Sequence, residues 1–371
     1  MGLNIFWEVV VGLVMLGCSG ATQPPTLRTT SGLPTPATGN PTLSTVHADL
    51  APLGQLIFND TNLSEPAGVS CASCHNPAAA FSGNNGSSIP GVALGSTPGS
   101  FGSRNVPQLT YNSFTPNFGF YPGFNEDPNA VGTGALVPLG GQFWDGRSID
   151  LSTQVSGPLF NPKEMNNTDR ASVIAKIRVA SYASAFLSLC DLSDFNNVDQ
   201  AFLCLSDAVA SFELSAAFQP FTSKFDYFLK GKVQLTVQEA QGFDLFKDPQ
   251  KGNCIFCHTA DVTSTHSVGW LFTDHGYDSI GIPRNSAIPV NADPNFFDLG
   301  LCGQPGIVNF APDGFDIDSL CTSFKDPTLR NIALTAPYGH NGFFETLRDI
   351  VRFYATRDTN PELWYPVDGL G

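Results

Sequence analysis

Apolar side chains recur at helical spacing in only a few parts of this chain, so the sequence predicts short helices separated by long loops. An amphipathic helix is expected where apolar residues return every three or four positions. A capping-box pattern at Thr236 and Glu239 marks the start of one helix, because each side chain can bond the backbone N–H of the other residue. The predicted helices cover residues 53–58, 168–190, 198–218, 237–246 and 344–356.

Two long segments, residues 76–142 and 259–327, have almost no helical period and are rich in Gly, Pro, Asn and Ser. The chain holds 36 Gly and 28 Pro, residue types that favour turns over regular elements. Long ordered loops often serve a binding or catalytic site. The order of helix, cysteine-containing loop and wrapped loops occurs twice. We therefore predict a mainly α fold with extensive loops, built from two tandem units over residues 46–222 and 223–371.

The N-terminus has the pattern of an export signal. Residues 5–17 are apolar, are too short a stretch to span a bilayer and end in small residues beside Cys18. We interpret residues 1–18 as a signal peptide, and residues 15–18 resemble a bacterial lipoprotein processing site; a buried N-terminal helix is the alternative. The Thr-, Pro- and Ser-rich residues 19–45 have the composition of a tether. The sequence predicts a protein of the periplasm or cell envelope, with lipid attachment at Cys18 as one form of anchoring.

The charge balance excludes one class of partner. The chain has 18 Lys and Arg against 33 Asp and Glu, for a net charge of −15, and no basic run is longer than a pair. Proteins that bind nucleic acid need a basic stripe to neutralise phosphates. We therefore expect no nucleic acid partner, and the acidic surface favours a basic protein partner instead.

Two segments, residues 71–75 and 254–258, fit C-x-x-C-H, the attachment pattern of a c-type haem. The two thiols add to the haem vinyl groups, and the adjacent His is placed to bind the iron. A four-cysteine zinc site is the alternative, but zinc needs no His after each pair, and the two pairs lie far apart in the chain. A thioredoxin-like pair is disfavoured because no strand–helix pattern surrounds either motif. We predict two covalently bound haem c groups, held by Cys71, Cys74, His75, Cys254, Cys257 and His258.

The remaining cysteines after the signal region form two local pairs, Cys190 with Cys204 and Cys302 with Cys321. Such pairs in an exported protein are typical of disulfides. Four buried free thiols are the alternative. The first disulfide would join the helices predicted over 168–190 and 198–218, and the second would close a long loop.

Residues able to fill a second axial position on iron are scarce. The chain has six His and three Met; no His lies between residues 76 and 257, and Met165 is the only Met after the signal region. The first haem therefore has no nearby His for its sixth position. The second haem must take His, Met165, Tyr, Lys or water. This asymmetry predicts an open iron position, where a small molecule can bind.

Three longer blocks, residues 141–165, 225–246 and 326–354, carry a wider resemblance. The first contains F-W-D-G-R and N-P-x-E-M, and the last contains L-R-N followed by P-Y-x-H-x-G. With the two C-x-x-C-H motifs, these blocks resemble the bacterial di-haem cytochrome c peroxidase family, including its MauG-like branch, over nearly all of residues 48–357. The resemblance implies two tandem cytochrome c-type domains with one covalent haem each, the N-terminal one peroxidatic and the C-terminal one for electron transfer.

The resemblance also implies roles for single residues. Trp144 matches a tryptophan between the two haems, Gln154 and Glu164 match a distal-pocket glutamine and acid, and Pro158 matches another pocket position. Tyr354 stands where peroxidases of the family often have Met as the axial ligand of the second haem, as in the MauG-like branch. Without the resemblance, Trp144 and Tyr354 would be core aromatics and Glu164 a surface acid. A calcium ion between the domains is implied at Asn105, Thr335 and Pro337.

The function implied by the resemblance is reduction of hydrogen peroxide to water, with electrons from a small soluble cytochrome c or a copper protein (cupredoxin). A homodimer is the implied assembly. The loop 76–104 lacks the His that reductively activated peroxidases of the family carry, so we expect an enzyme that is ready in its oxidised form. Two alternatives stay open: a MauG-like, peroxide-dependent oxidase that modifies Trp or Tyr of a partner protein, and a non-catalytic di-haem electron carrier.

Overall fold

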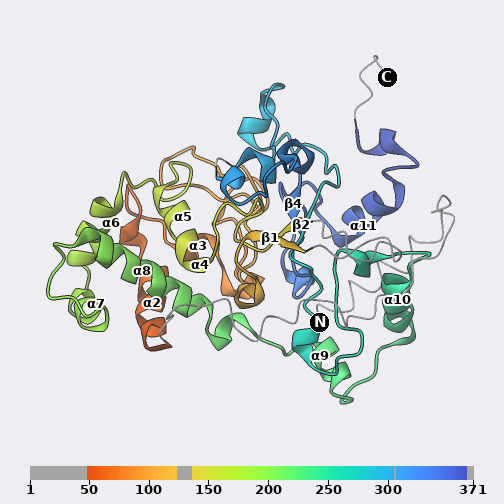
Figure 1. Cartoon of the computed structure of the whole chain (residues 1–371), viewed down its shortest axis with the longest axis horizontal. Helices are drawn as coiled ribbons and strands as arrows, with labels where there is room; N and C mark the ends of the chain where they lie inside the picture. The colour runs from red at the N-terminus through yellow and green to blue at the C-terminus, as the bar shows by residue number, and fades with distance from the viewer. Residues whose placement is uncertain (1–47, 123–135, 305, 366–371) are drawn as a thin grey trace.

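The computed structural model describes residues 48–122, 136–304 and 306–365 (Figure 1). The predicted signal peptide and tether, residues 1–45, lie outside the described residues. Within the described ranges, no single helix is long and apolar enough to cross a membrane. The helices Arg170–Arg178 and Ala183–Leu189 meet that test of length and composition only when they are taken together across a sharp bend.

Short helices joined by long loops make up most of the described chain, which confirms a mainly α fold with extensive loops. The α-helices are α2 (Ala51–Phe58), α3 (Cys71–Cys74), α4 (Leu151–Gln154), α5 (Ser156–Phe160), α6 (Arg170–Arg178), α7 (Ala183–Leu189), α8 (Val198–Glu213), α9 (Lys224–Leu229), α10 (Val237–Lys247) and α11 (Leu347–Thr356). The short strands β1 (Gly119–Pro122) and β2 (Leu136–Leu139) pair antiparallel, as do β3 (Tyr277–Asp278) and β4 (Phe324–Lys325).

Most of the predicted helices are confirmed as α2, α8, α10 and α11, with ends that differ by a few residues. The single helix predicted over 168–190 is wrong, because this segment forms α6 and α7 with a bend of 114° between them. The break places Tyr182 and Phe186 in the hydrophobic core. It also lets the Tyr182 hydroxyl donate to Asp60 Oδ2 at 2.7 Å. Tertiary packing therefore outweighs the continuous helical pattern of this segment.

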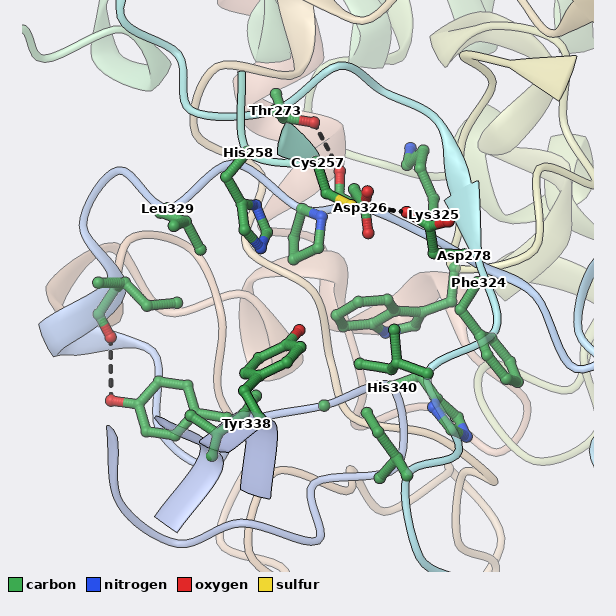
Figure 2. Close-up of a pocket in the computed structure, with 18 of the residues that line it drawn as sticks. Cys257, His258, Thr273, Asp278, Phe324, Lys325, Asp326, Leu329, Tyr338 and His340 are labelled. Carbon is green, nitrogen blue, oxygen red and sulfur yellow. Dashed lines mark hydrogen bonds between the residues drawn. The ribbon is translucent and has the colours of Figure 1, made fainter. Parts of the chain in front are cut away.

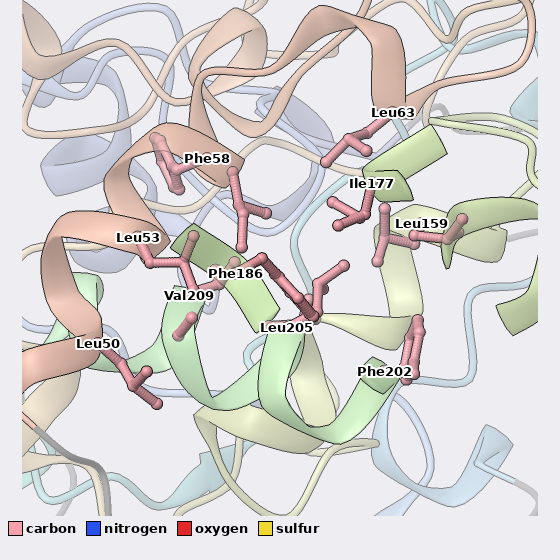
Figure 3. Close-up of a cluster of buried hydrophobic side chains, with 14 of the residues drawn as sticks. Leu50, Leu53, Phe58, Leu63, Leu159, Ile177, Phe186, Phe202, Leu205 and Val209 are labelled. Atoms are coloured by element: carbon pink, nitrogen blue, oxygen red, sulfur yellow. The ribbon is translucent and has the colours of Figure 1, made fainter. Parts of the chain in front are cut away.

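The main hydrophobic core lies in the first half of the described chain, where α2 packs against α8 (Figure 3). Gly54 allows this close approach, because a Cβ at that position would collide with the backbone carbonyl of Ala208. The predicted disulfide between Cys190 and Cys204 is confirmed and ties the end of α7 to α8. The first half is thus a helical core fastened at its edge by a covalent bond.

The second half is built from smaller clusters of buried side chains under long loops. One cluster surrounds Phe225, Phe246 and Trp270, and another surrounds Phe344 and Phe353 of α11. The predicted disulfide between Cys302 and Cys321 is also confirmed and closes a long loop between β3 and β4.

One local pattern occurs in both halves. A short hairpin, closed by a single antiparallel bridge, precedes a helix whose first residue follows a side-chain N-cap. The bridges are Gln142 with Ser148 before α4, capped by Asp150, and Tyr338 with Phe344 before α11, capped by Thr346.

Candidate active site

The cysteines of the two C-x-x-C-H motifs are the free thiols of the described chain. Cys71, Cys74, Cys254 and Cys257 form no disulfide, whereas the other four described cysteines are paired. The first pair lies on α3, which begins at a capping box formed by Ser70 and Ser73. All four thiols are therefore available for thioether bonds to haem.

Both motif histidines are held in an orientation that suits an iron ligand. His75 Nδ1 lies 2.7 Å from the carbonyl oxygen of Phe81, and His258 Nδ1 lies 3.3 Å from that of Phe272. Both Phe residues have positive φ values, of 60° and 57°. A carbonyl partner at Nδ1 leaves Nε2 as the free ring nitrogen, the common second-shell arrangement of metal-bound His.

Burial lowers the pKa of both His75 and His258 to about 4, so each imidazole is neutral near pH 7. Neutral imidazole is the form that coordinates iron. Thiols and imidazoles together therefore fit a covalently bound haem at each motif.

A large cavity of about 1520 Å³ opens beside the second motif. It exceeds the 300–1000 Å³ that is typical of pockets for small ligands, so it has room for a porphyrin. Cys254, Cys257 and His258 line one part of it. Figure 2 shows His258 and Cys257 across the cavity from Tyr338 and His340.

Tyr354, on α11, lies in the wall of the same cavity, and its assignment as an iron ligand stays a prediction. Its side chain is 46% exposed because it borders this open space. Desolvation of the phenol by the protein atoms around it, and then the charges of Asp326 and the motif cysteines, raise its pKa above the usual range. Met165, the other ligand type considered for the second haem, lies instead in the main hydrophobic core.

Three other histidines fall within the described residues. His275 and His340 line the cavity, whereas His266 is exposed. His340 stacks on Phe324 with ring centroids 3.6 Å apart, and its buried Nδ1 has no hydrogen-bond partner among the described residues. Burial lowers the pKa of His340 to about 4 and keeps the imidazole neutral.

Glu164 lies close to the thiols of the first motif. Burial and then the charge of Glu164 raise the pKa of Cys74 to about 12, and the same carboxylate also acts on Cys71. Asn161 Nδ2 donates to Glu164 Oε1 at 2.6 Å. Burial raises the pKa of Glu164, against the opposing effects of Arg147 and Asn161. The structure thus places a half-buried carboxyl with an elevated pKa within electrostatic reach of the first haem-binding motif.

Gln154 and Pro158 lie on α4 and α5, the two short helices that precede Glu164. Both side chains are half-buried. No hydrogen bond joins Gln154 to Glu164 within the part of the chain that the structure describes. Their assignment to the same pocket stays a prediction.

Sequence reasoning missed a second buried acid near the first motif, Glu213 at the end of α8. Burial raises its pKa to about 8. Its charge is the second-largest cause of the raised pKa of Cys71. The signal was present in the sequence, because Glu213 lies on the apolar face of a predicted amphipathic helix, where a charged side chain is unexpected.

Trp144 lines the cavity of the second motif, and both its indole N–H and its backbone carbonyl form hydrogen bonds. Its indole Nε1–H donates to the carbonyl oxygen of Asn105 at 2.8 Å, and its own carbonyl accepts from Lys325 N at 2.7 Å. Trp144 belongs to the hairpin that also carries Arg147, whose charge acts on Glu164. This hairpin therefore connects the surroundings of the two haem-binding motifs.

Asp145, next to Trp144, is buried and takes bonds from three side chains. Arg104 and Arg147 form ion pairs with it, the latter at 3.0 Å, and Gln304 Nε2 donates at 2.6 Å. Sequence spacing could not reveal this network because Arg104 and Gln304 are far from Asp145 along the chain.

The residues implied for calcium are only partly brought together. Asn105 Nδ2 lies 2.8 Å from the carbonyl oxygen of Pro337 and 3.2 Å from that of Gly339. The Thr335 hydroxyl donates to Ile332 within its own turn. Amide and carbonyl oxygens are the ligand types that calcium prefers. Asn105 Nδ2 donates to both carbonyl oxygens, so this contact is a pair of hydrogen bonds and gives no support for a cation by itself. The calcium ion stays a prediction.

Comparison with known proteins identifies close relatives of this architecture. A family model described as di-haem cytochrome c peroxidase matches residues 48–234. The methylamine utilization protein MauG of Paracoccus denitrificans is 36% identical over 311 residues, which cover 82% of this chain and 74% of that protein. Cytochrome c551 peroxidase of Nitrosomonas europaea is 28% identical over 319 residues, which cover 85% of this chain and 75% of that protein.

Two solved structures have a similar fold. The di-haem peroxidase BthA of Burkholderia thailandensis superposes with a TM-score of 0.78 at 40% identity, over 85% of this chain and 73% of that chain. A MauG-like protein associated with microbial copper homeostasis shares the fold, with a TM-score of 0.60 at 24% identity. These similarities favour a catalyst over a pure electron carrier.

Proposed function

Because the chain belongs to the di-haem cytochrome c peroxidase family, we propose that it holds two covalently bound haem c groups in two tandem cytochrome c-type domains. Residues 46–222 form the peroxidatic domain in this proposal, and residues 223–371 form the electron-transfer domain. The four free thiols, the two histidines bonded through Nδ1 and the hairpin repeated before α4 and α11 support this arrangement.

The protein is an oxidoreductase of the cytochrome c peroxidase type, which reduces hydrogen peroxide with electrons from a redox partner. Haem held by Cys71, Cys74 and His75 supplies the iron at which peroxide is reduced. The observation that supports the first motif as the peroxide site is the half-buried Glu164 within electrostatic reach of its thiols. The absence of His between residues 76 and 257 also supports an open iron position there.

Glu164 moves the proton in this proposal. As a carboxylate it would accept the proton of the inner peroxide oxygen and return it to the outer oxygen, so that the O–O bond breaks and the outer oxygen leaves as water. Two electrons from the donor and two further protons would convert the inner oxygen to a second water. Asn161 holds Oε1 in place through the 2.6 Å hydrogen bond. Burial raises the pKa of Glu164, which suits proton transfer near neutral pH. Gln154 and Pro158 complete the pocket.

The second motif receives the electrons. We assign His258 and Tyr354 as the two residues that would hold the iron of its haem, from their shared cavity and the position of Tyr354 in the family pattern. Trp144 conducts electrons between the two haem sites. Its N–H bond to Asn105 and the backbone bond from Lys325 hold the indole in one orientation.

A MauG-like function is the second candidate. On this reading peroxide is the oxidant, and a Trp or Tyr of a partner protein supplies the electrons. Two observations favour it: Tyr354 lies in the cavity with His258, and a relative that is 36% identical is named MauG.

The proposal has four further parts. The donor is a small soluble cytochrome c or a copper protein, and the assembly is a homodimer. A calcium ion lies at Asn105, Thr335 and Pro337, supported by the match of these positions to the family pattern. The protein is exported to the periplasm or cell envelope, with Cys18 as a site for lipid attachment; two disulfides and the apolar residues 5–17 support this location.

The test uses the purified ferric holoprotein. We expect two haems per chain, one high-spin and one low-spin signal in electron paramagnetic resonance, and peroxide consumption with reduced cytochrome c or cupredoxin. Two low-spin signals without turnover would contradict the proposed peroxide site. Mass spectrometry of candidate partner proteins after peroxide addition separates the two functions, because only the MauG-like enzyme leaves oxidised Trp or Tyr.

A further inference from the structure

A strongly acidic segment lies between β3 and β4. Residues 293–304 and 306–323, which we call the acidic strap, contain five Asp and no Lys, Arg or Glu. Asp298 forms an ion pair with Arg104. The other four form no ion pair with any residue that the structure describes: Asp293, Asp313, Asp316 and Asp318. Figure 1 shows this part of the chain, in light blue, at the outer edge of the molecule beyond β4.

The acidic strap is held in a fixed shape. The disulfide between Cys302 and Cys321 closes it, and two backbone bonds run beside the disulfide: Leu301 N to the carbonyl of Ser323 at 2.9 Å and Thr322 N to that of Leu299 at 2.8 Å. Its buried side chains, including Leu301, Ile307 and Leu320, pack against Phe118 of the first half. Such a surface loses little conformational freedom when a partner binds.

Large apolar side chains project from the acidic strap into solvent. Phe297 is 66% exposed and Val308 is 63% exposed, and Leu299 and Phe310 are exposed as well. Exposed apolar side chains bordered by charge are typical of protein-binding surfaces. The combination of apolar and acidic groups favours a partner whose own apolar face is ringed by Lys.

The acidic strap also forms part of the wall of the cavity at the second motif. Phe296, Phe297 and Asp298 line that cavity, together with Cys257 and His258. Phe297 therefore borders both solvent and the space assigned to the second haem.

Asp298 links the strap to Trp144. Arg104 Nε and Nη2 donate to the two carboxylate oxygens of Asp298 at 2.7 and 2.6 Å. The same guanidinium pairs with Asp145, the residue that follows Trp144. A protein bound on the acidic strap would thus lie against the wall that separates solvent from the second motif.

We propose that the acidic strap is the docking surface for the electron donor, and that this donor is a small basic redox protein with a Lys-ringed apolar face. The inference rests on the proposed function, because it assumes that electrons enter at the second haem. Each donor molecule gives up one electron, so two docking events supply the two electrons that reduce one peroxide to two waters. Opposite charges steer the encounter and make its rate dependent on salt.

The test compares two double variants of the holoprotein. In the strap variant, Asp313→Lys with Asp318→Lys, we expect the affinity for a basic cytochrome c at low ionic strength to fall about tenfold or more. The matched control, Asp49→Lys with Asp191→Lys, changes the net charge equally at exposed sites of the first half. We expect the control to keep most of the affinity. Isothermal titration calorimetry without peroxide measures binding independently of turnover.

A second comparison tests the apolar part of the surface. Leu299→Ser with Val308→Ser should weaken cytochrome binding, whereas Val179→Ser with Leu203→Ser, also at exposed positions, should not. Turnover of peroxide with a small organic reductant should be equal in all of these variants. If the wild type shows no such turnover, the proposed function is wrong, whereas the docking surface is still judged by the binding comparison. Equal cytochrome binding by strap and control variants, or a preference for an acidic donor, would overturn the docking surface.

Discussion

Glu164 combines burial, an elevated pKa and proximity to the first motif. If it moves the proton, Glu164→Gln should lower kcat/KM for peroxide by about 10²-fold or more, since a positioned acid–base group typically contributes 10²–10⁴. Haem content and the ferric spectrum should not change. Steady-state peroxide consumption measures the effect, with Glu345→Gln at an exposed position as the control.

The dependence of wild-type activity on pH gives a second test of proton transfer by Glu164. Glu164 must be ionised to accept the first proton, and burial raises its pKa. Activity should therefore fall on acidification at a higher pH than an ordinary carboxyl group would produce, and the Gln variant should lack this limb. Full turnover by Glu164→Gln would remove Glu164 from the mechanism.

Tyr354 is the residue on which the second haem's coordination depends. It borders the cavity that His258 lines, and its phenol lies within electrostatic reach of Cys254 and Cys257. Tyr354→Phe should remove the phenol ligand and convert the low-spin ferric signal of the second haem to high-spin. Electron paramagnetic resonance measures this change. An unchanged spectrum would exclude Tyr354 as a ligand, and Tyr227→Phe on α9 serves as the control.

At the scale of elements, the contact between α2 and α8 organises the first half. Gly54→Ala should destabilise the protein by about 3 kcal/mol, because the added Cβ must displace the backbone of Ala208 or the whole of α2. Gly306→Ala is a suitable control, since nothing lies near its Cβ position and its φ is negative. Chemical denaturation followed by circular dichroism measures both. Equal stability of the two variants would show that α2 can shift without cost.

The elements differ in how well their sequences predict them. The start of α10 is confirmed at Thr236, because a capping box is a local interaction between residues three apart. The break between α6 and α7 was not predicted, because it depends on the burial of Tyr182 and Phe186 and on a bond to Asp60 far along the chain. The apolar spacing of this segment continues across the break and therefore gives no sign of it.

For the whole molecule, Arg330 joins several segments of the second half that are far apart in the sequence. Its guanidinium pairs with the buried Asp226 at 3.0 Å, donates to the carbonyl oxygens of Trp270 and Ser267, and lies over the ring of Phe221. Arg330→Met should cost about 3–5 kcal/mol, because it leaves Asp226 buried without its cation. Thermal unfolding monitored by calorimetry measures the loss.

The matched control is Arg170→Met, which breaks the exposed ion pair with Asp199. An exposed pair contributes about 0–1 kcal/mol, so its loss should barely shift the unfolding temperature. Similar shifts for the two variants would contradict a special role of Arg330 in holding these segments together.

The amino-acid sequence by itself determined the features that depend on residues close together in the chain. Both haem-binding motifs, both disulfides and most helices were predicted, because thioether attachment, loop closure and capping all act over short separations. The acidic composition of the strap is likewise readable from the sequence alone.

Only the tertiary structure decided which of those residues meet. It placed Tyr354 in the cavity with His258, buried Glu213 near Cys71, and made the acidic strap a wall of the second site. The contacts responsible join residues that are far apart in the sequence; Arg104 and Asp298, for example, are separated by 194 positions. No local spacing encodes such pairs, because they form only when the loops wrap around shared cores.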